Sequence, residues 1–151
     1  MIEETWVYGW DLALAEIRKR GGLKRFKSVL FSMMFKNPPY PCEFCILHEG
    51  RKLLGAFTCE FIAHDDTYGV SNLWYIGDFD TAEGTHGMGR ELLERFMRKK
   101  SNRFYLCCWD NTAARFWYHM GKAYNLTVTE IGKSKYNMPV LQFGPREPHV
   151  Q

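Results

Sequence analysis

The sequence predicts an α/β (α+β) fold, with a mixed, mostly antiparallel sheet of about six to seven strands and flanking helices. Three strand-like runs follow one another between residues 42 and 79, which is typical of a meander. A strand–helix–strand unit comes next, and its connection is long enough for a parallel crossover. Two more strand-like runs, residues 126–131 and 138–144, complete the sheet.

The composition favours one globular domain. The chain has 151 residues, of which 46% are hydrophobic, and a formal net charge of +3. We predict a single domain over residues 1–144 and a polar tail over 145–151. No apolar run reaches membrane-spanning length, and the acidic start MIEETWVYGWD argues against a signal peptide. A cytoplasmic location is therefore expected, without a membrane partner.

The first forty residues predict a strand and two helices. Aromatic and β-branched residues indicate a strand over 5–10, and Asp11 suits the cap of a helix that ends at Gly21-Gly22. Apolar residues at intervals of three and four predict a second helix over 23–34. The segment NPPYP, residues 37–41, breaks the pattern.

The middle of the chain predicts a hairpin and a third strand. The runs CEFCILH (42–48) and KLLGAFTCEFIAH (52–64) flank a short turn, and VSNLWYIGDF (70–79) follows. Further on, RFYLCCW (103–109) is continuously apolar, as expected for a strand covered on both faces. The run DNTAARFWYHMG then predicts a helix with an Asp or Asn cap and a glycine stop.

A glycine-rich turn opens the helix between these two regions. In GTHGMGRELLERF, which begins at Gly84, three glycines run directly into apolar residues at helical spacing. Glycines permit positive φ angles and close approach of another molecule. A helix N-terminus offers unpaired N–H groups and partial positive charge. The turn therefore predicts a phosphate site.

The element order and this turn resemble the GNAT superfamily of acyl-coenzyme A-dependent N-acyltransferases. The family's cofactor loop, Q/R-x-x-G-x-G/A, corresponds to Gly84 through Gly89. Its second signature resembles Asn111, Ala114, Trp117, Tyr118 and Gly121. The resemblance implies a splay between the fourth and fifth strands and acetyl-CoA as co-substrate. It also implies an N-acetyltransferase that moves the acetyl group to a primary amine by direct transfer in a ternary complex.

Two positions depart from the family pattern. Gly84 stands where the family usually has Gln or Arg. The second signature is one residue short between its tyrosine and glycine if Asn111 is the anchor. If Asp110 is the anchor instead, the spacing is restored and Trp117 takes the place of the tyrosine. Both registers remain open.

The resemblance assigns the cofactor-binding residues. It puts the pantetheine arm beside the backbone of the fourth strand and the pyrophosphate on the glycine-rich turn. The second signature adds a contact from the helix that follows the fifth strand. Arg90, Arg115 or Lys122 would meet the adenosine 3′-phosphate. The implied cofactor-binding set is Gly77, Phe79, Thr85, His86, Gly87, Met88, Gly89, Arg90 and Asn111.

The chemistry needs a proton acceptor for the amine and a proton donor for the departing thiolate. The family often gives the donor role to the tyrosine of the second signature, which corresponds to Tyr118. Our predicted catalytic residues are Tyr118 first, and then Asp78 and Glu60. Asp78 and Glu60 are the candidates for the base, with His64 as an alternative. A water relay would need none of these residues.

The five cysteines predict no metal site. Cys42 and Cys45 form a single C-x-x-C, whereas a structural zinc site usually needs two such pairs. Buried, reduced thiols are expected instead, in agreement with a cytoplasmic location.

The partner is expected to be a small-molecule or protein amine. A nucleic-acid acceptor is an alternative, because six basic residues cluster between Arg18 and Lys27, although a solvated helix face is the favoured interpretation. A second alternative is a catalytically degenerate GNAT-like binding or structural protein, suggested by the altered motifs. An exposed last strand would give an edge for a homodimer.

Overall fold

In the computed structural model, which describes residues 1–146, seven strands form one sheet in the order β1-β2-β3-β4-β5-β7-β6. Strands β4 and β5 are neighbours and run parallel, whereas the other pairings described are antiparallel. The predicted mixed sheet with flanking helices is confirmed, and the splay between β4 and β5 stays a prediction. The strands are β1 (Glu3–Tyr8), β2 (Glu43–Glu49), β3 (Lys52–Asp65), β4 (Val70–Thr81), β5 (Phe104–Cys107), β6 (Leu126–Lys133) and β7 (Pro139–Pro145). The helices are α1 (Trp10–Arg18), α2 (Val29–Lys36), α3 (Met88–Lys99) and α4 (Asn111–Ala123), with a short 3₁₀ helix, η1 (Leu23–Arg25).

The chain divides into two compact units. Unit 1 comprises Met1–Glu60 and Ile76–Lys99, and the described part of unit 2 comprises Phe61–Tyr75 and residues 100–146. Each unit has its own core. The boundary predicted after residue 144 stays a prediction: β7 ends at Pro145, and residues 147–151 of the predicted tail lie outside the described residues.

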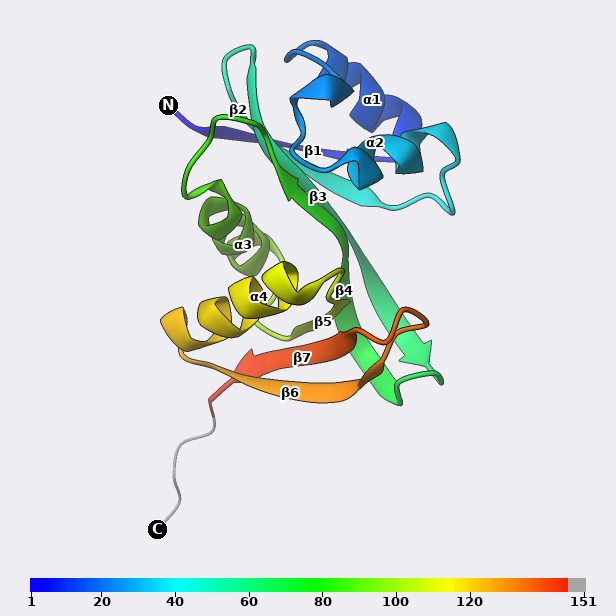
Figure 1. Ribbon diagram of the computed structural model, residues 1–151. Coiled ribbons are helices and arrows are strands. Elements are labelled where there is room, and N and C mark those ends of the chain that lie inside the picture. The colour runs from blue at the N-terminus through cyan, green and yellow to red at the C-terminus, as the bar shows by residue number, and fades with distance from the viewer. Residues whose placement is uncertain (147–151) are drawn as a thin grey trace. The chain divides into compact units, whose positions relative to one another are not determined.

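Unit 1 has helices on both faces of its strands (Figure 1). Because side chains alternate along a strand, Phe44 and Ile46 of β2 join the core formed with α1 and α2. Phe57 of β3 packs edge-to-face on Phe96 of α3, with ring centroids 5.8 Å apart. Burial on both faces explains why β2 reads as an almost continuous apolar run.

Unit 2 packs α4 against a group of three antiparallel strands, β5, β7 and β6 (Figure 1). Trp117 of α4 contacts Phe104 and Phe143, whose rings stack 4.6 Å apart. A second apolar cluster contains Tyr105 of β5 and Val140 of β7, together with the β4 residues Val70 and Leu73.

The predicted helix over 23–34 is wrong in its first half. Phe26 is extended and forms an antiparallel bridge with Ala82, so only η1 and the later α2 are helical. The Lys27 N–H donates to the Thr81 carbonyl at 3.0 Å, and the Glu83 N–H donates to the Arg25 carbonyl at 2.7 Å. These long-range backbone bonds override the helical spacing of the side chains.

Two boundaries at the start of the chain also differ from prediction. Strand β1 begins at Glu3 and ends at Tyr8, before Gly9 turns the chain at a φ of 98°. Helix α1 then begins at Trp10, so Gly9 rather than Asp11 is its N-cap. The Gly9 N–H donates to the Cys42 carbonyl at 2.9 Å, which fixes this turn.

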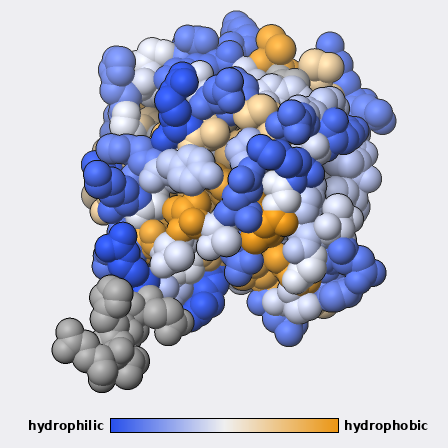
Figure 2. Space-filling model, turned by 60° about the horizontal axis from the view of Figure 1, so that its bottom comes forward, coloured by the Kyte–Doolittle hydropathy of each residue, from blue (hydrophilic) through white to orange (hydrophobic). Residues whose placement is uncertain are grey.

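The prediction that the last strand forms an exposed edge of the sheet is wrong. Strand β7 lies between β5 and β6, so β1 and β6 are the edge strands. A homodimer stays a prediction, without the proposed pairing edge. The face drawn in Figure 2 is mostly hydrophilic, with hydrophobic residues near its middle and a few at its upper edge. Within residues 1–146, every helix is too short or too polar to cross a membrane.

Candidate active site

The glycine-rich turn lies between β4 and α3 in unit 1. Gly84 and Gly87 have φ angles of 76° and 74°, which other residues adopt only with strain. A Cβ atom added to either glycine would meet no atom within 4 Å. Helix α3 begins at Met88, and the first N–H groups of a helix have no partner within it. The turn therefore presents open backbone and positive charge at a helix N-terminus.

Two side-chain hydrogen bonds, one from a buried threonine and one from a lysine, stabilise the glycine-rich turn. Thr85 is buried, and its hydroxyl donates to the Ala82 carbonyl at 2.6 Å. The Lys27 ammonium donates to the Thr85 carbonyl at 3.3 Å. Because the backbone of Lys27 is bonded to Thr81, this positive charge is fixed beside the glycine-rich turn. Sequence reasoning missed Lys27 at this position, because the predicted helix separated it from the turn.

Asp78 is a partly buried carboxylate in the same unit. Its backbone N–H donates to the Thr58 hydroxyl at 2.8 Å, which ties β4 to β3 at this point. Burial raises the pKa of Asp78 to about 6. At neutral pH the side chain is therefore mostly ionised, yet it binds a proton more readily than an ordinary carboxylate. That combination suits a proton acceptor.

Tyr40 and Glu60 lie close to Asp78. The Tyr40 hydroxyl is hydrogen-bonded to the Glu60 carboxylate. Burial, and after it the negative charges of Glu60 and Asp78, raises the pKa of Tyr40 above its ordinary value. Burial, and after it the negative charges of Asp78 and Glu60, raises the pKa of Cys42 to about 12. The structure thus brings together Asp78 and Glu60, two of the three predicted catalytic residues.

Sequence reasoning missed Tyr40. It belongs to the proline-rich segment before β2, which we expected only to break the helical pattern. Its backbone carbonyl accepts a hydrogen bond from the Trp10 indole, so a side chain of α1 fixes the segment. No local pattern indicates that this tyrosine meets a carboxylate on β3, because the contact depends on tertiary structure.

The second signature is built around the start and the end of α4. Asp110 is the N-cap, and its carboxylate accepts a hydrogen bond from the Ala113 N–H at 2.7 Å. Trp117 is buried in the core of unit 2. A Cβ atom on Gly121 would lie 2.2 Å from Cγ2 of Val128 on β6. The glycine of this signature is thus required by packing.

Several solved structures resemble the whole chain. Diaminobutyrate acetyltransferase EctA from Paenibacillus lautus, in complex with L-2,4-diaminobutyric acid and coenzyme A, has a TM-score of 0.57 and 13% identity, covering 100% of both chains. The N-acetyltransferase YlbP from Bacillus subtilis, in complex with coenzyme A, has a TM-score of 0.57 and 16% identity, covering 96% of this chain and 97% of the other. AtaTR bound with acetyl-CoA has a TM-score of 0.61 and 11% identity, covering 93% of each. The chain has the GNAT fold.

No protein-family model matches the chain, and no curated protein matches it by sequence. At 10–16% identity, the agreement with GNAT structures is therefore one of fold. A shared fold does not assign site residues, so the site of this chain is defined by the positions of its own residues.

The predicted site residues are distributed over both units. Unit 1 holds the glycine-rich turn, Asp78 and Glu60, together with Gly77 and Phe79 of β4, and Phe79 stacks on Phe57 with centroids 6.1 Å apart. Unit 2 holds Asn111 and Tyr118, both exposed, the tyrosine by 46%.

Three cations are alternative candidates for the contact with the 3′-phosphate. Arg90 and Lys122 are exposed on α3 and α4, and Arg115 donates to the Thr112 hydroxyl at 3.3 Å. Among the turn residues, His86 and Gly87 are exposed, whereas Met88 and Gly89 are partly buried at the start of α3. The assignment of each to the cofactor stays a prediction.

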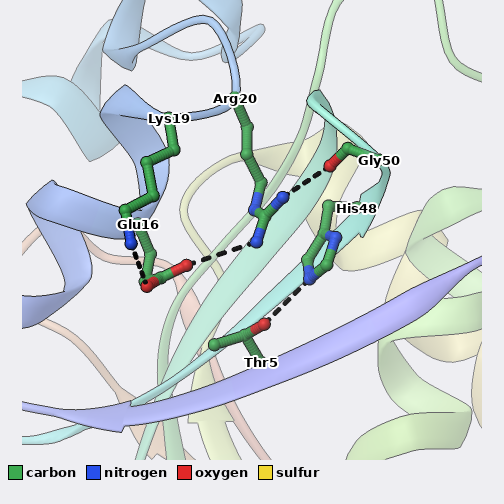
Figure 3. A network of polar contacts seen from close by, with 6 residues as sticks. All are labelled: Thr5, Glu16, Lys19, Arg20, His48 and Gly50. Atoms are coloured by element: carbon green, nitrogen blue, oxygen red, sulfur yellow. Dashed lines mark hydrogen bonds and ion pairs between the residues drawn. The ribbon is translucent and has the colours of Figure 1, made fainter.

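Part of the basic cluster Arg18 to Lys27 has a structural role (Figure 3). Glu16 accepts from Lys19 at 3.1 Å and from Arg20 at 3.3 Å, and Arg20 also donates to the Gly50 carbonyl. The neighbouring His48 is buried and hydrogen-bonded to the Thr5 hydroxyl at 2.8 Å. Burial, and then the charge of Arg20, lowers the pKa of His48. The network joins the end of α1 to the β2–β3 hairpin.

The cysteines do not resemble nucleophiles. Within residues 1–146 all five are free thiols, and all except Cys107 are buried. Burial raises the pKa of Cys108 to about 11, so this thiol stays protonated at neutral pH.

Proposed function

We propose that this protein is an N-acetyltransferase that moves the acetyl group of acetyl-CoA to a primary amine by direct transfer. One observation carries the proposal: the turn Gly84–Gly89 presents open backbone at the N-terminus of α3, in a GNAT fold. Structural neighbours in complex with coenzyme A or acetyl-CoA support the choice of co-substrate.

The N–H groups at the start of α3 would bind the pyrophosphate. Thr85 contributes backbone only, because its hydroxyl is bonded to Ala82. Lys27 adds positive charge beside a turn that has Gly84 in place of the usual Gln or Arg. The pantetheine arm would run along β4 beside Gly77 and Phe79, and Asn111 would contribute from α4.

Asp78 would accept the proton of the acceptor. An amine reaches the site largely as an ammonium ion, and the carboxylates of Asp78 and Glu60 favour the approach of a cation. Asp78 takes one proton, directly or through water, and the neutral nitrogen attacks the thioester carbonyl. A C–N bond forms, the nitrogen loses its second proton to water, the C–S bond breaks, and Tyr118 would give a proton to the departing thiolate and regain one from water. Glu60, hydrogen-bonded to Tyr40, would orient the acceptor.

Acetyl-CoA binding, measured by isothermal titration calorimetry, tests the proposal. We expect a Kd of about 1–100 μM, a range typical of co-substrates. Gly87→Glu should weaken binding at least about 100-fold, since a carboxylate would occupy and repel the pyrophosphate site. Gly50→Glu is the matched control, because Gly50 also has a positive φ, 58°, and open space around its Cβ position. It should change the Kd less than about twofold.

If the folded wild type does not bind acetyl-CoA, the proposed acetyltransferase activity is refuted. The departure at Gly84 favours one other function, a GNAT-like binding protein without catalysis. Binding of acetyl-CoA without release of free coenzyme A thiol, over a panel of primary amines, would support that alternative. A cytoplasmic location belongs to the same proposal and is supported by the five free thiols.

A further inference from the structure

Two carboxylates of the candidate site in unit 1 lack a compensating cation. Asp78 of β4 and Glu60 of β3 both lie close enough to Cys42 to act on it with their negative charges. In the described part of the chain, no lysine or arginine is among the groups that shift the pKa of Asp78 or Cys42. Asp80, two residues further along β4, differs, because the positive charge of Lys27 is close to it. The first two carboxylates therefore favour a ligand that brings positive charge.

Glu60 is held in place by Tyr40. The Tyr40 hydroxyl is hydrogen-bonded to the Glu60 carboxylate, and the Tyr40 carbonyl accepts a hydrogen bond from the Trp10 indole. Trp10 is buried and packs edge-to-face on Phe35 and Phe44, with ring centroids 4.9 Å and 4.8 Å apart. The tyrosine is thus anchored to the core of unit 1 through its backbone. A carboxylate that is already oriented loses little conformational entropy when a ligand binds.

The proposed reaction uses only one of the two carboxylates as a base. Asp78 takes a proton from the reacting ammonium ion, and this transfer neutralises both groups. Glu60 has no part in that transfer, so an acceptor with a single amino group leaves its charge without a partner. An acceptor with a second ammonium group provides a partner for Glu60 before and after the reaction.

We propose that the acceptor is a diamine, of which one amino group reacts beside Asp78 and the other is bound by Glu60 as an ammonium ion. Tyr40 is a positioning residue that acts through Glu60. The reacting ammonium loses one proton to Asp78 and a second to water as the C–N bond forms and the C–S bond breaks, and the product keeps the ammonium group at Glu60. All three residues belong to unit 1.

Reaction at the first nitrogen rests on the proposed function, whereas binding of the diamine needs no acetyl-CoA. Turnover and binding are therefore measured separately, each with putrescine and with butylamine. The two amines have the same carbon chain and differ in the second amino group. A preference for putrescine consequently reports the second ammonium group alone.

Release of coenzyme A thiol measures turnover. The wild type should prefer putrescine about 10- to 100-fold in kcat/KM, the effect of one hydrogen bond between charged groups. Glu60→Gln should reduce this preference to less than about threefold. Tyr40→Phe should lower it about 3- to 10-fold, mainly through a higher KM for putrescine. Glu49→Gln, which removes an exposed carboxylate at the end of β2 away from Cys42, should keep the wild-type preference.

Calorimetry without acetyl-CoA measures binding, and circular dichroism verifies that each variant is folded. Putrescine should bind the wild type more tightly than butylamine, and Glu60→Gln should remove the difference. If this result is obtained but coenzyme A thiol is not released with either amine, the diamine site is supported and the acetyl transfer fails. The diamine is overturned if the folded wild type acetylates both amines equally, or, without turnover, binds both equally or neither. A preference for putrescine that the folded Glu60→Gln variant retains also overturns it.

Discussion

The glycines of the two sequence signatures serve different physical purposes. Gly84 and Gly87 lie in unit 1 at positive φ, and a Cβ on either would point into open space. Gly121 in unit 2 has no such backbone requirement, but a Cβ there would lie 2.2 Å from Val128. The first pair leaves a surface open for a ligand, whereas the third lets a helix approach a strand. A glycine in a family signature is therefore evidence of function only after packing has been considered.

Two side chains near the signatures show a similar difference between a residue available for chemistry and a residue required for packing. Asp78 in unit 1 is a carboxylate held partly out of water without a cation among the groups that shift its pKa. Trp117 in unit 2 is a buried aromatic residue between Phe104 and Phe143. From this comparison we expect changes in unit 1 to alter chemistry and most changes in α4 to alter stability.

Asp78→Asn should have the largest effect. Loss of the proton acceptor lowers kcat/KM about 10²- to 10⁴-fold, measured as release of coenzyme A thiol with the best amine of a panel. In the wild type, the rate should rise with pH up to about 6 and then level off, as the Asp78 carboxylate ionises. Asp11→Asn, at an exposed position on α1, is the control. An unchanged rate in the Asp78→Asn variant would assign the base to another residue or to water.

Tyr118→Phe tests whether unit 2 contributes to the chemistry. If the hydroxyl protonates the thiolate, kcat should fall about 100-fold while the Kd for acetyl-CoA stays the same. The adjacent His119→Gln, also exposed on α4, should leave kcat within about twofold. Equal activity of Tyr118→Phe and the wild type would make α4 a purely structural element in the comparison.

Gly121→Ala should destabilise the protein by about 1–3 kcal/mol, because the added methyl group overpacks the contact with Val128. Denaturant unfolding measures the loss. Trimming the neighbour, in Gly121→Ala/Val128→Ala, should restore part of it relative to Val128→Ala alone. Gly84→Ala should cost about 1 kcal/mol through its positive φ, and no trimmed neighbour can relieve that cost. Equal rescue at both glycines would contradict the distinction drawn between them.

The smallest effect concerns stability and pH. The folded pKa of Asp78, about 6, is higher than its ordinary value of 3.8, so the folded state favours the protonated form. The wild type therefore loses stability as the pH rises from about 3.8 through 6, and the loss is complete above that range. At pH 7.5 Asp78→Asn should be more stable than the wild type by roughly 1–2 kcal/mol. The difference should disappear near pH 4, and a constant difference would exclude the raised pKa as its cause.

Local patterns in the sequence were sufficient for most elements of the fold. Alternating or continuous apolar runs identified β2, β3 and β4, and the glycine-rich turn identified the start of α3. The helical spacing after Leu23 was misleading, because backbone bonds to Thr81 and Glu83 extend the chain at Phe26. Helix propensity depends on neighbouring residues, so it does not predict hydrogen bonds to a distant segment of the chain.

The candidate site was only partly accessible from sequence. Asp78 and Glu60 could be named from strand positions, but the Tyr40 contact and the position of Lys27 depend on segments far away in the chain. The pKa of Asp78 was equally inaccessible, since burial is a property of the packed molecule.

The sequence by itself determined where strands and helices form and where a bare turn meets a helix N-terminus, because these depend on neighbouring residues. Only the tertiary structure decided which carboxylates share an environment, why Gly121 has no side chain, and that β7 lies between β5 and β6. Each of those depends on contacts between residues distant in the chain, and the order of neighbouring residues does not specify such contacts.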